Sequence, residues 1–385
     1  MRPYLSLLFA VAATSAAFAA PVIRIERGGS VAKQIASVEV SGDPAFRQTL
    51  ERNLVLSGAF QLSADPSSAS IRVTGASGGE IVVAGAGKRL SMKSRAGDAK
   101  SARSEARRLS DKMCETFAGQ KGFASDRLAF VVKNGRSEEL CSGYADGGDM
   151  RQLTKDGKAS IGPRWKDSGT LYYTGYLRGA PEIYEIDAVS GARRLMWGFG
   201  GLTTGAAASP RDGRVAIILS KAFGNPELCV IDPANGTWSR LTKTKTGNEG
   251  QPCWSPDGSS IAYVSDESRR QHIYIIDPAT KAKRRLTSTG NNVDPDWGPD
   301  GRIVYTTRRG GQSQIAVLSP AEDDATAQLV TQPGSWEHPT WTRDGRHVIA
   351  ERDGVLFLVD TLPDGDAPRK LFGVKGRSIT PTMSR

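Results

Sequence analysis

Hydrophobic and polar positions alternate in short runs over the last two-thirds of the chain, and these runs recur at a regular spacing. Each unit combines a Pro-x-Trp segment, an Asp-Gly turn and an apolar run such as residues 261–265. The Trp position recurs at Trp165, Ala208, Trp254, Trp297 and Trp341, a period of 43 to 46 residues. Short strands joined by tight turns at this period are typical of β-propeller blades.

Two further strands follow in each unit, and six copies of both predict six blades. The third strands are expected at residues 140–144, 183–187, 228–232, 273–277, 315–319 and 356–360, and the fourth at 151–154, 193–195, 240–242, 284–287, 328–330 and 369–371. The first unit lacks its opening strand, and residues 379–384 stand where the next Pro-x-Trp segment would fall, with Met383 in the Trp position. We therefore expect the C-terminal strand to complete the first blade and close the ring, which protects the edge strands.

The region before the repeats follows a different pattern. Asp43-Pro44 is a helix start, Phe46, Leu50 and Leu54 recur at helical spacing, and a second apolar stripe runs from Ala102 to Phe117. Strand-like runs are expected at residues 35–40, 71–74, 80–84 and 89–93. The predicted organisation is a leader at 1–19, a small α/β domain at 20–122 and a propeller at 123–385, with 20–30 as a mobile partner-binding segment.

The first residues have the pattern of a cleaved secretory signal, because a basic Arg2 precedes an apolar run and Ala17-Phe18-Ala19 offers small cleavage residues. No later stretch is apolar enough to span a membrane. The net charge is +10, and the basic residues are spread along the chain, so nucleic acid is not an expected partner. A positive surface favours anionic lipids, cell-wall polymers or acidic proteins instead.

Candidate chemistry is sparse. Cys114, Cys141, Cys229 and Cys253 have no metal-site spacing, and one long-range disulfide in an oxidising compartment stays open. Residues 75–79 match a G-x-S-x-G motif, but they lead into a strand, so a turn is favoured over a nucleophile elbow. Residues 85–88 lack the elements of a phosphate loop, and no nucleotide or other cofactor is expected.

The chain as a whole resembles the TolB family, periplasmic propeller components of the Tol-Pal cell-envelope system. The resemblance is carried by the blade motifs and by residues 21–25, 54–60, 106–111, 120–123, 128–132 and 139–147. Ala208 stands where the family has Trp, and the α/β domain is short around residues 65–70, which indicates a divergent member.

This resemblance implies a periplasmic, non-catalytic adaptor for outer-membrane integrity and envelope constriction during cell division. Its implied partners are a Pal-like peptidoglycan-associated lipoprotein at one channel mouth, a TolA-like inner-membrane protein at the N-terminal segment, and possible outer-membrane proteins. The TolA-like contact falls on Val22, Ile23, Arg24 and Ile25. The segment is expected either to dock on its own domain or to be released to a partner, which couples the two sites.

The Pal-like contact is expected on the loops that join the outer strand of one blade to the inner strand of the next. Its candidates are Ser160, Thr203, Thr204, Asn248, Glu249, Asn291, Asn292, Trp336, Glu337 and His338. Trp336 is either an exposed interface anchor or a cap on its own blade. His272 and His347 are expected away from this surface, as ordinary surface or blade residues.

The alternative readings are an enzyme, either a carbohydrate lyase or a peptidase-like propeller, and a propeller that binds cell-wall glycans. A lyase-type metal site needs several imidazoles or carboxylates converging on the axis, and His338 is the only histidine on the predicted mouth loops. The enzyme and adaptor readings are distinguished by metal content and activity.

Overall fold

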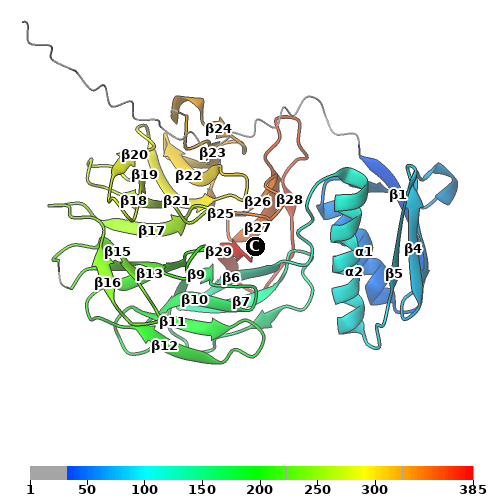
Figure 1. The fold of residues 1–385 in the computed structure, drawn as a ribbon, viewed down its shortest axis with the longest axis horizontal. Coiled ribbons are helices and arrows are strands. Elements are labelled where there is room, and N and C mark those ends of the chain that lie inside the picture. The colour runs from blue at the N-terminus through cyan, green and yellow to red at the C-terminus, as the bar shows by residue number, and fades with distance from the viewer. Residues whose placement is uncertain (1–32, 222, 323, 385) are drawn as a thin grey trace, which may run out of the picture. The chain divides into compact units, whose positions relative to one another are not determined.

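The computed structural model describes residues 33–221, 223–322 and 324–384. The predicted leader and the predicted partner-binding segment with Val22, Ile23, Arg24 and Ile25 lie outside the described residues. A small α/β region comes first and a six-bladed β-propeller follows, as the sequence pattern predicts (Figure 1). No helix among the described residues is long and apolar enough to cross a membrane.

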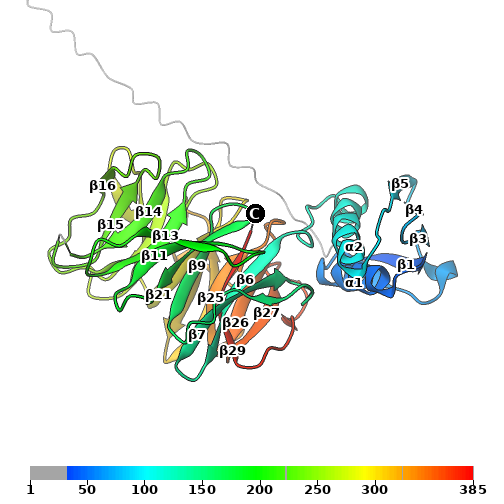
Figure 2. The same cartoon turned by 90° about the horizontal axis from the view of Figure 1, so that it is seen from below.

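The α/β region is one five-stranded sheet with two helices on one of its faces (Figures 1 and 2). The sheet order is β2-β1-β3-β4-β5, and β1 is parallel to β2 and β3. The elements are β1 Gln34–Ser41, α1 Pro44–Leu56, β2 Phe60–Leu62, η1 Pro66–Ser68, β3 Ile71–Ala76, β4 Glu80–Gly85, β5 Lys88–Lys93, α2 Ala99–Met113 and the π-helical turn η2 Cys114–Ala118. The sequence prediction missed the short strand β2 and the short helix η1.

Local sequence explains the helix ends. The Asp43 carboxylate accepts a hydrogen bond from the Ala45 N–H at 2.8 Å, and Pro44 occupies the first turn, where its missing N–H costs nothing. Gly119 adopts the left-handed conformation, with φ 66°, and ends η2. The G-x-S-x-G match forms the turn between the antiparallel β3 and β4, so the prediction of a turn is confirmed.

Each propeller blade is a four-stranded antiparallel sheet. Blade 1 is β29 Arg377–Met383, β6 Arg127–Asn134, β7 Ser137–Tyr144 and β8 Arg151–Gln152; blade 2 is β9 Ser160–Trp165, β10 Thr170–Gly175, β11 Glu182–Asp187 and β12 Arg193–Trp197; blade 3 is β13 Thr203–Ala208, β14 Val215–Leu219, β15 Glu227–Ile231 and β16 Trp238–Arg240. Blade 4 is β17 Glu249–Trp254, β18 Ile261–Ser265, β19 His272–Ile276 and β20 Lys283–Arg285; blade 5 is β21 Asn291–Trp297, β22 Ile303–Arg309, β23 Gln312–Leu318 and β24 Gln328–Leu329, with η3 Asp324–Thr326 between its last two strands; blade 6 is β25 Trp336–Trp341, β26 His347–Arg352, β27 Val355–Asp360 and β28 Arg369–Lys370.

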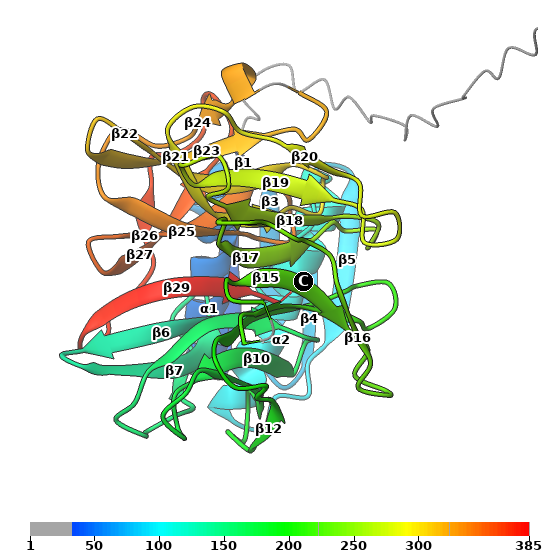
Figure 3. The same ribbon diagram turned by 90° about the vertical axis from the view of Figure 1, so that its left-hand side faces the viewer.

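The C-terminal strand closes the ring. In blade 1, β29 pairs antiparallel with β6, with Met383 opposite Leu128, and the Ser384 hydroxyl accepts a hydrogen bond from the Arg127 N–H at 2.7 Å. The red β29 lies beside the teal β6 in Figure 3. The sequence prediction of this shared blade is confirmed.

Two of the repeated tryptophans, Trp165 and Trp254, bond to neighbouring blades. The Trp254 indole N–H donates to the Ala207 carbonyl of blade 3 at 2.9 Å, and the Trp165 indole N–H donates to the Thr382 carbonyl of blade 1 at 3.0 Å. These bonds support the prediction that the blade tryptophans are structural. Cys114, Cys141 and Cys229 are free thiols, so the long-range disulfide that the sequence left open is not formed in the structure.

A buried ion-pair network joins α2 to the loop between β7 and β8. The Arg107 guanidinium donates to Asp146 at 2.7 and 3.1 Å and to Asp149 at 2.7 Å, and its side chain is 1% exposed. Asn53 of α1 also donates to Asp146, at 2.8 Å, and Arg107 lies over the Tyr144 ring. Buried charges need this degree of pairing, so the network ties the helices to blade 1.

Candidate functional site

The innermost strands β9, β13, β17, β21, β25 and β29 define two ends of the propeller. These strands begin at the end that we call the mouth end. Asn291 pairs with Arg308 and Trp336 pairs with Arg352, so the second strands end where the innermost strands begin. The hairpins between the second and third strands therefore also lie at the mouth end. The innermost strands finish at the other end, which we call the turn end, where the Asp-Gly hairpins and the loops between third and fourth strands lie. Because the same strands supply both ends, side chains from distant segments gather around the channel.

Each innermost strand carries a bulge at the same position, three residues before its Trp position. The pairing register shifts there in all six blades. The six bulge residues have positive φ and form what we call the mouth ring: Gly162, Gly205, Gln251, Asp294, His338 and Thr380. Left-handed backbone in non-glycine residues is strained, and a bulge re-aims the side chain that carries it. Four polar side chains of this ring therefore depart from the regular alternation of a strand.

Three polar members of the mouth ring, Gln251, Asp294 and His338, bond to one another or to the second strands. The Asp294 N–H donates to the Gln251 side-chain oxygen at 2.9 Å, and the Gln251 amide donates back to the Asp294 carboxylate. Thr306 donates from its hydroxyl to the same carboxylate at 3.2 Å and accepts from the His338 N–H at 3.2 Å. The ring is thus a bonded constellation and not a set of independent loop residues.

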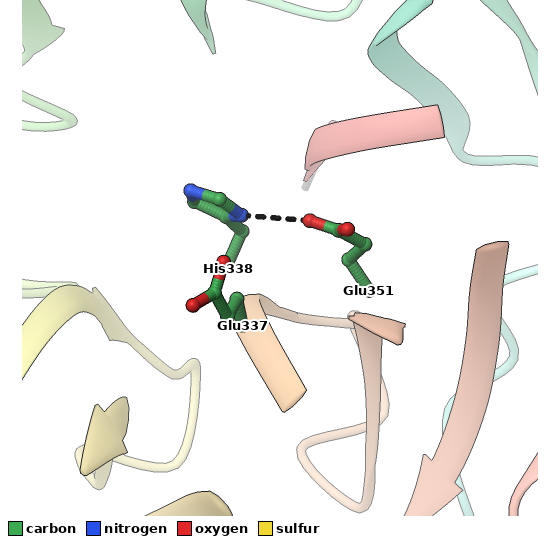
Figure 4. Close-up of side chains that lie close together, drawn as sticks. All are labelled: Glu337, His338 and Glu351. Atoms are coloured by element: carbon green, nitrogen blue, oxygen red, sulfur yellow. Dashed lines mark hydrogen bonds and ion pairs between the residues drawn. The ribbon is translucent and has the colours of Figure 1, made fainter. Parts of the chain in front are cut away.

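His338 is the titratable centre of this ring. Its Nδ1 lies 3.1 Å from the Glu351 carboxylate, as the dashed line in Figure 4 marks, and its Nε2 lies 3.9 Å from Asp294. Burial disfavours the charged imidazole, but the nearby Asp294 and Glu351 carboxylates outweigh burial and raise the pKa of His338 above its usual value. The same ion pair overcomes burial at Glu351 and lowers the pKa of that carboxyl.

Glu337, His338 and Glu351 also form the one group of potential metal ligands among the described residues, with ligand atoms within 4.8 Å of one another. Arg308 pairs with Glu337, and Arg377 lies 3.3 Å from Glu351. These two guanidinium groups already balance the carboxylates, so a divalent cation would have to displace them. The cluster is explained as an ion-pair network.

A cavity of about 310 Å³ opens inside the mouth ring. Its apolar walls come from Ile161 and from the prolines that follow four of the mouth-ring residues in the sequence. Its polar atoms come from Thr204 and from the mouth ring itself. The four prolines are Pro163, Pro252, Pro339 and Pro381. A mainly apolar wall with a few polar groups is the usual composition of a binding cavity. We call this the mouth cavity.

Arg164 separates the mouth cavity from a second cavity of about 300 Å³ at the turn end, and it lines both. Its guanidinium lies 3.3 Å from the Pro295 carbonyl and 3.5 Å from the Asp296 carboxylate. Arg164 belongs to blade 2 and Asp296 to blade 5, which face each other across a six-bladed ring. The side chain therefore bridges the channel and gives the mouth cavity a floor.

The structure gathers the ten predicted residues at the mouth end, but it divides them by exposure. Asn248 and Asn291 are exposed, Thr204, Glu337 and His338 are half-buried, and the remaining five are buried: Ser160, Thr203, Glu249, Asn292 and Trp336. Only Thr204 and His338 line the mouth cavity. Sequence reasoning missed Gly162, Gly205, Gln251, Asp294 and Thr380, although each stands three residues before a Trp position and most precede proline.

Trp336 is not an exposed anchor. Its side chain is 2% exposed and meets the Phe357 ring of its own blade edge-to-face at 5.4 Å. Because side chains alternate between the faces of a strand, the first residue of β25 faces the blade core while Glu337 faces outward. The alternative that Trp336 caps its own blade is the correct one.

Glu249 is a buried acid that forms no ion pair with any residue in the described part of the chain. Its side chain accepts one hydrogen bond from Ser265 at 3.2 Å, and its other oxygen has no hydrogen-bond partner among the described residues. Burial, with repulsion from Glu227 added, raises the pKa of Glu249 to about 8. The carboxyl is therefore neutral at pH 7 and belongs to the blade, not to the exposed surface.

The other two histidines do not assemble a catalytic group with these residues. His272 is buried, with Nδ1 3.4 Å from the Asn292 amide, so it contacts a predicted mouth residue that the sequence reading kept separate from it. His347 is buried beside Asp344, with 2.6 Å between Nδ1 and the carboxylate, and packs on the Phe123 ring. Among the described histidines, only His338 lines the mouth cavity.

These observations define a six-bladed β-propeller protein with a floored cavity at one end of its axis. The model of the TolB β-propeller domain matches residues 114–384, and the chain belongs to this family. It is 28% identical over 170 residues to the Tol-Pal system protein TolB of Bordetella pertussis, a match that covers 44% of this chain and 39% of that protein. The chain therefore matches less than half the length of this relative.

Two solved structures share the fold. TolB from Acinetobacter baumannii superposes with a TM-score of 0.79 at 22% identity, over 92% of this chain and 98% of that one. A putative TolB from Agrobacterium tumefaciens gives a TM-score of 0.52 at 22% identity, over 66% of this chain and 90% of that one. At this identity, likeness supports the architecture and leaves function to the site.

Proposed function

We propose that this protein is a non-catalytic periplasmic adaptor of the Tol-Pal system, secreted through a cleaved leader. Its mouth end binds a Pal-like peptidoglycan-associated lipoprotein, and residues 20–30 bind a TolA-like protein through Val22, Ile23, Arg24 and Ile25. Its role is to link envelope layers during constriction. Family membership and the Tol-Pal relatives support this assignment.

The observation that carries the proposal is the mouth cavity. A partner side chain or loop tip that enters it meets proline walls and the polar groups of Gln251, Asp294 and His338, with Arg164 as the floor. Outside the cavity, Asn248, Asn291 and Glu337 present polar groups to the same partner. An apolar centre with a polar rim is the usual anatomy of a protein interface.

The rival enzyme reading finds no support in the arrangement of these side chains. The carboxylates of the Glu337-His338-Glu351 cluster are bound by arginines, and a lyase would need them free for a metal. Measurement of metal content and of glycan-lyase activity on the purified protein tests this reading directly.

The proposal is tested by pull-down from envelope extract with the mature protein, followed by mass spectrometry. The mouth variant is Glu337→Lys with His338→Ala, which changes one half-buried residue beside the cavity and one that lines it, and leaves the buried Trp336 intact. The control is Glu322→Lys with Thr280→Ala, two exposed residues of turn-end loops. Recovery of a peptidoglycan-binding lipoprotein by wild type and control but not by the mouth variant is expected; equal recovery by all three contradicts the proposed face.

A further inference from the structure

Four arginines from two neighbouring blades surround an open cleft at the mouth end. Arg269 and Arg270 lie on the hairpin between β18 and β19, and Arg308 and Arg309 end β22 of the next blade. The cleft measures about 800 Å³ and is completed by Gly290, Asn291, Gly310 and Gly311. We call these eight residues the arginine cleft.

The positive charge of the cleft is only partly balanced. Glu337 pairs with Arg308, and Arg309 donates to the Thr289 hydroxyl at 2.8 Å. The side chains of Arg269 and Arg270 are exposed and make no hydrogen bond or ion pair within the described residues. The two acids of their own hairpin are engaged elsewhere: Glu267 pairs with Lys283 at 2.5 Å, and Asp266 accepts hydrogen bonds from Asn248 at 2.7 and 3.0 Å. Two guanidinium groups therefore remain available to an external anion.

Arg269 stands where the backbone favours glycine. Its φ is 75°, and its N–H bonds to the Asp266 carbonyl at 2.8 Å. The equivalent hairpin positions of blades 2 and 3, also three residues before the third strand, hold Gly179 and Gly224 with φ 90° and 85°. A non-glycine residue held in this conformation costs stability, so this turn carries an arginine where its backbone prefers glycine.

The opposite wall of the arginine cleft leaves room for a ligand to approach its backbone closely. Gly310 and Gly311 form a two-residue hairpin with φ 59° and 79°, and no atom lies within 4 Å of where a side chain would begin at either position. Neither backbone N–H donates a hydrogen bond within the described residues. Guanidinium forks and free backbone N–H groups are the donors that bind phosphate oxygens.

We propose that the arginine cleft binds the phosphate groups of an anionic ligand. An anionic lipid headgroup and a soluble phosphate ester both carry this chemistry. Four guanidinium groups of fixed charge around one open cleft favour phosphate, which offers three or more acceptor oxygens, over an isolated carboxylate. The site lies next to the mouth cavity through the Arg308–Glu337 pair, but it does not depend on the identity of the lipoprotein partner.

The test measures binding of the mature protein to three probes at fixed salt. The first probe is phosphatidylcholine vesicles with about a third of the lipid replaced by phosphatidylglycerol, and pure phosphatidylcholine vesicles are their reference. The second probe is inorganic pyrophosphate, and the third is polyglutamate. The cleft variant is Arg269→Gly with Arg270→Gln, which restores the favoured turn residue while removing two charges. The matched control is Arg284→Gln with Arg285→Gln, two adjacent arginines on the outer strand of the same blade.

The cleft variant is expected to bind the phosphate probe about 25-fold more weakly, at roughly fivefold per arginine, and the control to stay within about twofold. Binding to the anionic vesicles identifies a lipid headgroup as the source; binding to pyrophosphate but not to vesicles identifies a soluble phosphate.

Tighter binding of polyglutamate than of either phosphate probe overturns the proposal in favour of an acidic protein. Equal losses in variant and control also overturn it, since net charge alone would then explain binding. The midpoint of thermal unfolding of the cleft variant should not fall, which separates lost binding from lost folding.

Discussion

The two ends of the propeller are built from the same six strands, but they differ in what repeats. At the turn end, short polar turns recur from blade to blade, as in Asp257, which accepts the Ser259 N–H at 3.0 Å. At the mouth end, the backbone bulge recurs while its side chain changes from Gly162 to Gln251, Asp294 and His338. The residues of the turn end are thus explained by the turns that they form. At the mouth end the backbone conformation is the same in each blade, but the side chains differ from blade to blade.

The α/β region sharpens this contrast, because its helices bond turn-end loops, besides the Arg52 bond to the Leu371 carbonyl next to β28. Arg107 bonds Asp146 in the loop after β7, and the Arg369 side chain beside the loop after β27 donates to the Val55 carbonyl of α1. The mouth end keeps its cavity and its unpaired arginines instead. We therefore expect turn-end substitutions to change stability and exposed mouth-end substitutions to change binding.

The largest effect is expected at the turn-end anchor. Arg107→Ala removes the partner of two buried or half-buried carboxylates, so the free energy of unfolding should fall by roughly 3–5 kcal/mol. Denaturant unfolding followed by circular dichroism measures this loss. Arg269→Gly at the mouth end serves as the comparison and should lose nothing; a loss below about 1 kcal/mol for Arg107→Ala would contradict the anchor.

Substitution of a buried mouth-end residue should lower stability, as substitution at the turn end does. Trp336→Ala leaves a hole beside Phe357 and should cost roughly 3 kcal/mol of unfolding free energy. Glu337→Lys, one residue further and half-buried, should cost well under about 1 kcal/mol because it breaks only a surface pair with Arg308. If the two variants are equally stable, Trp336 is not part of the blade core.

Glu249 should make stability depend on pH. Its folded pKa of about 8 lies above that of the unfolded chain, so the native state binds more protons between pH 4.5 and 8, and stability falls as pH rises through this window. Glu249→Gln should remove this slope and be more stable than wild type at pH 8, on the order of 2–3 kcal/mol. Thermal melts across this pH range check it; parallel curves for both proteins would refute the assignment.

His338 should give the smallest effect. Its folded pKa is raised, so the ion pairs with Asp294 and Glu351 stabilise the protein fully at pH values below the unfolded pKa, and this contribution is lost as pH rises through the folded pKa. The stability difference between wild type and His338→Gln should shrink as pH rises from about 6 to about 8. An imidazole titration by NMR gives the folded pKa independently, and a value below about 6.5 would contradict the ion pairs.

Sequence reasoning predicted the blades because their signals are local. The Asp-Gly turns, the Trp positions and Met383 in the C-terminal strand each occur within a few residues of the element they define. Trp336 was ambiguous because a shift of one residue at a strand start moves a side chain to the other face. The mouth ring could not be predicted from the sequence because it depends on bulges that interrupt this alternation of side chains. The arginine cleft could not be predicted because it forms where two hairpins about 40 residues apart in the sequence meet.

The most direct test of the account is a titration of the purified periplasmic domain of the Pal-like lipoprotein into three forms of the mature protein. These are wild type, the mouth variant Glu337→Lys with His338→Ala, and the turn-end control Glu322→Lys with Thr280→Ala. We predict that the mouth variant loses at least about tenfold in affinity, or roughly 1.4 kcal/mol, while the control matches wild type. Unchanged affinity in the mouth variant, or an equal loss in the control, would contradict the assignment of partner binding to the mouth end.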